Sequence, residues 1–160
     1  LKTATLSSND KIPPAFAGMD WNTSHREGKA AAGKKLFTAR GCIACHLAPD
    51  DGKGGSIGPS LVDVHTRFSP QYLAESILLP NRFVSPNFHP TTLTIKDGTI
   101  HTGFIEKDGD LVELRMITGI VMKLSGAQIS KRATSHQSMM PAGLVQSPVE
   151  MNHLLAYMLD

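Results

Sequence analysis

Apolar residues recur at helical spacing early in the chain and predict a helix over residues 25–39. Ser24 and Glu27 have the spacing of a capping box, which places the start of this helix just after Ser24. Gly33 lies inside the helix, where the missing side chain lets another helix approach closely. Gly41 follows the last periodic residue, so we expect the helix to stop before it. The predicted apolar face includes Ala32, Leu36 and Phe37.

Two later segments also have helical patterns. Ser69 and Pro70 are typical of an N-cap and a first helical position, and Pro80 ends the helix that they open. Ser147 and Glu150 form a second capping-box pattern near the end of the chain. The helix that follows has four apolar residues on one face, at positions i, i+3, i+4 and i+7: Met151, Leu154, Leu155 and Met158.

The pattern between these helices changes from helical spacing to alternation. Residues 91–129 contain four short alternating segments separated by turns, and Asp97-Gly98 is a strong hairpin signal. We therefore expect a mainly α protein with a small antiparallel β insertion, either a meander or a partial barrel. Residues 1–20 are expected to form an irregular arm, and residues 21–160 one domain in which residues 89–133 are the β-rich insertion.

Composition narrows the class of protein. The 160 residues are 41% apolar and 19% charged, as in ordinary globular proteins, and the net charge is only +2. There is no run of like charges that would favour nucleic acid, and no apolar run of the roughly 20 residues that span a bilayer. Aromatic residues make up only 6%, so a bound apolar cofactor could supply core area that aromatic side chains do not.

The two cysteines of the chain stand in the segment Cys42-Ile43-Ala44-Cys45-His46. This spacing is compatible with a redox disulfide, half of a zinc site, or covalent attachment of haem. The helical pattern before Cys42 disfavours a thioredoxin-type pair, and no second pair at ligand spacing completes a zinc site. Haem attachment accounts for all three residues, because each thiol adds to one vinyl group and the adjacent imidazole of His46 binds the iron.

A second axial ligand is predicted in the loop Ser138–Gly143, which precedes the last helix. Pro141 restrains the residue before it to an extended backbone, and this favours Met140 over Met139. His136 is the rival ligand. The other histidines are more typical of surface or core positions: His65, His89, His101 and His153.

On these residues the sequence resembles the class I c-type cytochromes. Gly33–Phe37, Gly41–His46 and Leu154–Tyr157 are similar to the first helix, the haem attachment site and the last helix of that family. The resemblance implies a helical haem domain whose first and last helices cross at Gly33 and Phe37. The segment Gly58-Pro59-Ser60-Leu61 is similar to a haem-flanking motif, which implies that Pro59 O accepts a hydrogen bond from His46 Nδ1 and that Leu61 flanks the haem.

More narrowly, the chain resembles a haem-binding domain associated with bacterial membrane-bound dehydrogenase-like proteins. The similar residues are Tyr72–Pro80, the Asp-Gly hairpin region and Ser138–Leu144. This resemblance implies that Tyr72 contacts the haem and that a strand-rich insertion precedes the methionine loop. Together the similar segments cover roughly residues 22–88 and 134–160.

The predicted function is electron transfer by one haem c, attached through Cys42 and Cys45 and ligated by His46 and Met140. Arg67 and Arg82 are candidates to pair with the haem propionates. The chain would be a carrier, or the electron-transfer domain of a larger dehydrogenase, rather than an enzyme itself. Its partners would be redox proteins, such as a dehydrogenase or a terminal reductase or oxidase. The resemblance implies the periplasm or the outer face of a membrane.

Two alternatives remain open at this point. A haem sensor or peroxidase-like enzyme would use the same attachment site with a displaceable methionine ligand. A structural or zinc-binding module would make the cysteine motif incidental.

Overall fold

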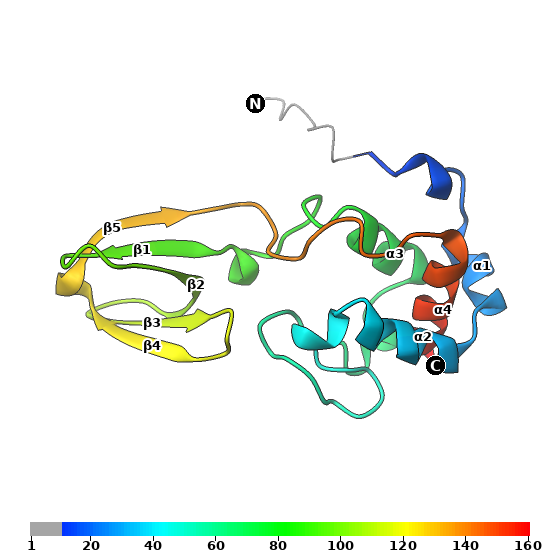
Figure 1. The fold of residues 1–160 in the computed structure, drawn as a ribbon, viewed down its shortest axis with the longest axis horizontal. Coiled ribbons are helices and arrows are strands. Elements are labelled where there is room, and N and C mark those ends of the chain that lie inside the picture. Colours follow the sequence, from blue (N-terminus) through cyan, green and yellow to red (C-terminus); the bar gives the residue numbers. More distant parts are fainter. Residues whose placement is uncertain (1–10) are drawn as a thin grey trace.

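A computed structural model describes residues 11–160. It has a helical part and a sheet part, joined by two connecting segments (Figure 1). The helical part contains α1 (Trp21–Ser24), α2 (Ala30–Ala39), α3 (Pro70–Leu78) and α4 (Pro148–Leu159). Short 3-10 turns occupy Pro14–Phe16, His25–Glu27, Cys42–Ala44, Val64–Thr66, Pro86–Phe88 and Gly126–Gln128.

Helices α2 and α4 pack closely because glycines face the backbone of α4. A Cβ atom at Gly33 would overlap the carbonyl group of His153, and one at Gly28 would overlap that of Asn152. One helical turn beyond Gly33, the rings of Phe37 and Tyr157 meet edge to face at 5.6 Å. The predicted crossing at Gly33 and Phe37 is therefore confirmed.

The helix predicted over residues 25–39 is wrong in its first part. The chain instead forms α1, a 3-10 turn and then α2, which begins at Ala30. Gly28 is extended, with φ −73° and ψ 162°, and this breaks the helix where α4 crosses. Ser24 Oγ donates to Asn152 Oδ1 at 3.1 Å instead of capping the helix. At the N-terminus of α2, the backbone N–H of Lys29 donates to His153 Nδ1 at 3.0 Å.

The N-caps predicted for the other two helices are confirmed. Ser69 Oγ accepts from Tyr72 N at 3.2 Å, and Ser147 Oγ accepts from Glu150 N at 3.3 Å. Only the second half of the Ser147 capping box fails. The Glu150 carboxylate accepts from Gln146 N at 3.0 Å, one residue before the N-cap.

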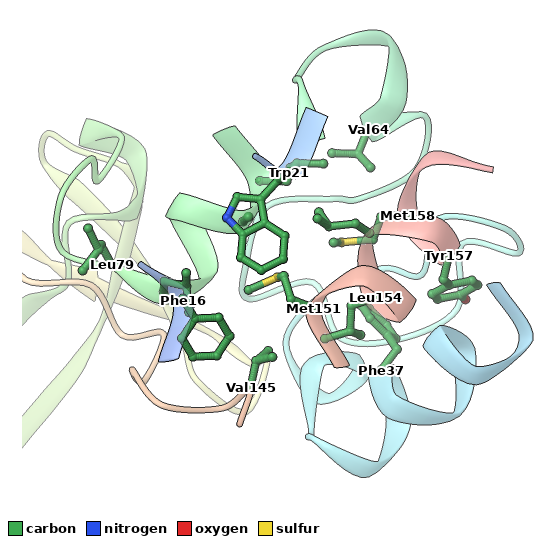
Figure 2. Close-up of a cluster of buried hydrophobic side chains, with 14 of the residues drawn as sticks. Phe16, Trp21, Phe37, Val64, Leu79, Val145, Met151, Leu154, Tyr157 and Met158 are labelled. Carbon is green, nitrogen blue, oxygen red and sulfur yellow. The ribbon is translucent and has the colours of Figure 1, made fainter. Parts of the chain in front are cut away.

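The core of the helical part collects side chains from all four α-helices and from the segment before α1 (Figure 2). Trp21 is 1% exposed and lies 6.2 Å from Phe16, measured between ring centroids. Phe16 is itself buried in a 3-10 turn, and Ile12 and Met19 pack against the same core, so these three side chains anchor residues 11–20 to the helical part. The rest of the predicted arm, residues 1–10, lies outside the described residues.

The sheet part has one strand more than expected. Strands β1 (Thr91–Ile95), β2 (Ile100–Lys107), β3 (Leu111–Met116), β4 (Val121–Ser125) and β5 (Ile129–Thr134) pair antiparallel in the order β4-β3-β2-β1-β5. The chain therefore passes from one edge of the sheet to the other between β4 and β5. The sheet has its own core, made of Leu93, Val112, Leu114 and Leu124.

The expectation of a mainly α fold is thus wrong. The helices are short, and a five-stranded antiparallel sheet with a separate core stands beside them. The predicted count of four strands omitted β5. That strand has no alternation of buried and exposed positions, because only Ile129 is partly buried at this edge.

Candidate cofactor site at Cys42, Cys45 and His46

Cys42, Cys45 and His46 project from a single turn directly after α2. Gly41 has φ +79° and ends the helix in the left-handed conformation that favours glycine. A 3-10 turn over Cys42–Ala44 follows, and the N–H groups of both Cys45 and His46 donate to Cys42 O, at 3.1 and 3.0 Å. The tight turn keeps the two sulfur atoms and the imidazole next to one another.

Both cysteines are free thiols and are half-buried. Burial raises the pKa of the Cys42 thiol, and the nearby Cys45 adds to this effect. The Cys42 side chain therefore remains a neutral thiol near pH 7. A thiol of this kind can add across a carbon–carbon double bond, with its proton going to the neighbouring carbon.

His46 is held by the loop that follows the cysteine turn. Its Nδ1 lies 2.7 Å from Pro59 O, the hydrogen bond that the sequence predicts. Because a carbonyl oxygen can only accept, Nδ1 carries the proton and Nε2 presents an unprotonated lone pair. Burial lowers the pKa of His46, and the hydrogen bond to Pro59 opposes that shift in part. A neutral imidazole with one oriented free nitrogen is the form that binds a metal.

Glycines let the loop of residues 52–59, the Pro59 loop, lie against the cysteine turn of residues 42–46. A Cβ at Gly58 would lie 2.8 Å from His46 Cε1, and one at Gly55 would overlap Ala44 O. The Gly58 amide donates to Cys45 O, and the Gly55 amide to Ile43 O, both at 2.8 Å. The sequence pattern assigned Gly58 to the haem-flanking motif but did not predict these close contacts with the cysteine turn. The density of glycine between Gly52 and Gly58 was the available signal of a closely packed loop.

The remaining predicted residues of this region lie in the same loop or on α3. Leu61 is half-buried and packs on the helical core. Arg67 Nη2 donates to Ser60 O at 2.7 Å and to Val62 O at 3.1 Å, so this guanidinium braces the loop after Pro59. Tyr72 is 40% exposed on α3, and its ring stacks on Phe68.

Arg82 follows α3 and pairs with Glu75 at 2.9 Å. Both arginines proposed for the propionates therefore have partners within the protein.

The predicted methionine loop is fixed beside the end of α3. Ser138 N donates to Asn81 Oδ1 at 2.8 Å, and Met140 N donates to Ser138 Oγ at 3.0 Å. Met139 and Met140 are both half-buried. These contacts hold the backbone of the loop but do not show whether Met139 or Met140 would supply the ligand.

His136, the rival ligand, lies edge-on against His89, with 4.7 Å between ring centroids. His89 Nε2 donates to Val84 O at 3.1 Å. This pair stands where the two connecting segments enter the sheet.

A separate cavity of about 420 Å³ lies between α2, α4 and the segments around Pro49 and His65. Lys34, Asp50 and Tyr157 line it, and they bond to one another: Asp50 accepts from Lys34 Nζ and from Tyr157 Oη, both at 2.6 Å. None of the three residues of the cysteine turn lines this cavity.

Within residues 11–160, no three His, Cys, Asp or Glu side chains converge as the ligands of a metal ion. In the same part of the chain, no helix combines the length and apolar character of a membrane span.

The comparison with protein families agrees with the geometry of the cysteine turn. The family model for Cytochrome c matches residues 30–93, which run from the start of α2 through the cysteine turn, the Pro59 loop and α3 into β1. The match covers less than half of the chain and leaves out the methionine loop and α4. It supports a c-type cytochrome domain, and with it covalently bound haem and electron transfer. No curated protein matches the chain.

Proposed function

We propose that this chain is a monohaem c-type cytochrome that carries single electrons between redox proteins. The observation that supports this most is the cysteine turn itself. Two free thiols and an imidazole project from one turn, and the Pro59 hydrogen bond leaves His46 Nε2 free to bind iron. The matched family has the same chemistry.

The residues present fit a covalently attached haem. Cys42 and Cys45 would each form one thioether bond, in which the sulfur bonds to a vinyl carbon and the thiol proton moves to the adjacent carbon. His46 and Met140 would bind the haem iron. When bound, the haem iron supplies reversible one-electron exchange between its ferric and ferrous states.

The chain contributes by controlling the ligands. The Pro59 carbonyl fixes the plane of the His46 ring and makes the imidazole a stronger donor. A thioether is a weaker donor than an imidazole and favours the ferrous state, so Met140 would raise the reduction potential above that of a bis-histidine site. Since about 59 mV changes a one-electron equilibrium tenfold, small adjustments of these ligands matter.

The setting of this electron transfer is part of the proposal. The likeness to domains of membrane-bound dehydrogenase-like proteins suggests a dehydrogenase, or a terminal reductase or oxidase, as the partner. Because covalent haem attachment requires reduced thiols and haem delivered outside the cytosol, the compartment that we propose is the periplasm or the outer face of a membrane.

The mass of the intact protein, produced in a host that matures c-type cytochromes, tests the attachment. We expect the mass of the polypeptide plus one haem, and loss of that mass in Cys42→Ser combined with Cys45→Ser. A wild-type mass equal to the bare polypeptide would overturn the proposal and would leave the structural or zinc-binding alternative.

Optical spectra of the same preparations test the ligands. We expect a low-spin spectrum with a ferric sulfur-to-iron band that Met140→Ala abolishes and Met139→Ala retains. The reverse result would assign the ligand to Met139. Rapid binding of CO to the ferrous wild-type protein would instead indicate a displaceable ligand and favour the sensor or peroxidase-like alternative.

A further inference from the structure

Arg115 on β3 extends out of the sheet toward the Pro59 loop. Its Nη1 donates to Ser56 O, and its Nε donates to the carboxylate of Glu106 on β2. The guanidinium also lies over the Phe104 ring, 5.7 Å from the centroid. The Arg115 side chain is only 17% exposed, whereas its partners Ser56 and Glu106 lie at the surface. Arg115 is thus held from three sides.

The sheet is shaped to hold this arginine. The register between β2 and β3 shifts between Ile105 and Lys107, which makes Glu106 the extra residue of a β-bulge. A bulge re-aims a side chain, and here it brings the Glu106 carboxylate to Arg115. A planar guanidinium can serve this carboxylate and the Ser56 carbonyl together, since its donors point in fixed directions.

Ser56 stands in the middle of the loop that supports His46. The flanking Gly55 and Gly58 amides donate to the cysteine turn, and three residues after Ser56 the Pro59 carbonyl accepts from His46. Ile57, the next residue, is 5% exposed, so the loop is packed against the protein directly after Ser56. The cysteine turn thus holds the loop from one side, and Arg115 holds it from the other.

The bond from Arg115 to Ser56 is also unique in its position. Among residues 11–160 it is the one hydrogen bond that joins a strand of the sheet to the segment 42–61. Nearby, Phe88 in the segment that leads into β1 meets Phe104 through apolar contact, with 5.6 Å between the ring centroids. Apolar contact does not fix a backbone carbonyl, whereas a charged donor does.

We propose that Arg115 is a positioning residue: it fixes the Pro59 loop and, through the Pro59–His46 hydrogen bond, sets the orientation and donor strength of the iron ligand. The sheet then influences the reduction potential of the haem through His46. This inference rests on the proposed function, because it concerns the ligand of a haem. Its structural half, the restraint of the loop, holds with or without the haem.

The test uses Arg115→Met, which keeps an apolar stem over Phe104 and removes the donors. Hydrogen exchange at the Gly55 and Gly58 amides and at His46 Nδ1 reports the restraint of the loop. We expect exchange about tenfold faster than in the wild type, the size expected for loss of one hydrogen bond to a charged group. On the haem-loaded protein, we expect the midpoint potential of the variant to differ from that of the wild type by enough to change the redox equilibrium at least about threefold.

Arg132→Met is the matched control. It also removes an arginine of the sheet that pairs with a carboxylate, Asp108 at 2.7 Å, but it has no contact with the loop. We expect wild-type exchange and wild-type potential in this variant. A change equal to that of Arg115→Met would show a general effect of sheet charge and would overturn the inference.

Two further variants keep the inference testable if Arg115→Met does not fold. Arg115→Lys retains the charge but lacks the planar fork, so we expect faster loop exchange than in the wild type. Glu106→Gln keeps the donor to Ser56 and removes the ion pair, so we expect an intermediate effect. Wild-type loop exchange and potential in Arg115→Met, or in both of these variants, would overturn the inference.

Failure of the proposed function would look different. A wild-type protein without attached haem would refute the electron carrier, while the exchange measurements on that polypeptide would still decide whether Arg115 restrains the loop.

Discussion

At the scale of single residues, the neighbours of His46 fix both the orientation and the protonation state of its ring. The Pro59 carbonyl accepts a hydrogen bond from the Nδ1–H of the ring, and Gly58 leaves the space in which the ring lies. Burial keeps the imidazole neutral by lowering its pKa. Each of these effects acts on orientation or protonation, so each can be removed without touching the cysteines.

Gly58→Ala is expected to displace the His46 ring. The new Cβ would lie 2.8 Å from Cε1 and 3.0 Å from Nδ1, closer than non-bonded atoms approach, so the hydrogen bond to Pro59 should lengthen or break. The measurement is the exchange rate of the Nδ1 proton together with the haem spectrum. Ser56→Ala, an exposed change in the same loop, is the control. An unperturbed Nδ1 proton in Gly58→Ala would show that the loop adapts.

Asp50 is expected to contribute a measurable acid dependence of stability. The hydrogen bonds from Lys34 and Tyr157 lower its pKa from 3.8 to about 2, so the folded protein favours the ionised carboxylate. This stabilisation is present above about pH 4 and is lost as the pH falls toward 2, because the unfolded chain then binds a proton first.

Asp50→Asn should therefore flatten the pH dependence of the free energy of unfolding between about pH 4 and pH 2. At neutral pH the cost should be about 1 kcal/mol or less, as for other exposed pairs. Urea unfolding at several pH values measures both. Asp51→Asn, whose carboxylate lies 3.5 Å from Lys53 Nζ, serves as the comparison. If the free energy of unfolding of Asp50→Asn fell with pH as in the wild type, Asp50 would not be the source of the acid dependence.

At the scale of elements, the contact of α2 with α4 depends on Gly33. Gly33→Ala should destabilise the protein although alanine is the better helix former by about 1 kcal/mol. The new methyl group would overlap the His153 carbonyl and force the helices apart, at a net cost of about 1–3 kcal/mol. Denaturant unfolding gives the value, and Lys35→Ala on the exposed face of α2 is the control. A stabilised Gly33→Ala would contradict the packing.

The elements that could be predicted from the sequence are those with local signals. Ser69 and Ser147 mark helix starts because their hydroxyl groups bond the chain a few residues on, and the cysteine turn is a contiguous motif. The break at Gly28 depends on α4, which is distant in sequence, and so could not be predicted from the capping pattern of Ser24 and Glu27. Strand β5 lies at an exposed edge, where no alternation is required.

The supporting residues of the site were the least predictable for the same reason. Arg115 occupies an ordinary position in an alternating strand, and nothing near it in sequence points to Ser56. The contact exists only because the sheet lies beside the loop, as Figure 1 shows for the β3–β4 end of the sheet.

At the scale of the whole molecule, the two parts have separate cores, and the chain enters and leaves the sheet at one point. Ser135 N donates to Pro90 O at 2.9 Å, just before β1 begins and just after β5 ends. The sheet can therefore be removed and the chain closed with a short glycine linker between these two residues, because its ends already lie together. The helical core contains none of the sheet residues.

Deletion of residues 91–134 should separate the attachment of haem from the tuning of its reduction potential. The cysteine turn, the Pro59 hydrogen bond and the Ser138–Asn81 contact remain, so we expect haem to attach and both ligands to bind. The tether from Arg115 is lost, so loop exchange and midpoint potential should move in the same direction as in Arg115→Met and at least as far. Mass, spectrum, hydrogen exchange and redox titration measure these four properties on one preparation. Failure to incorporate haem would show that the sheet completes the pocket, whereas a wild-type potential would show that it has no influence on the iron ligand.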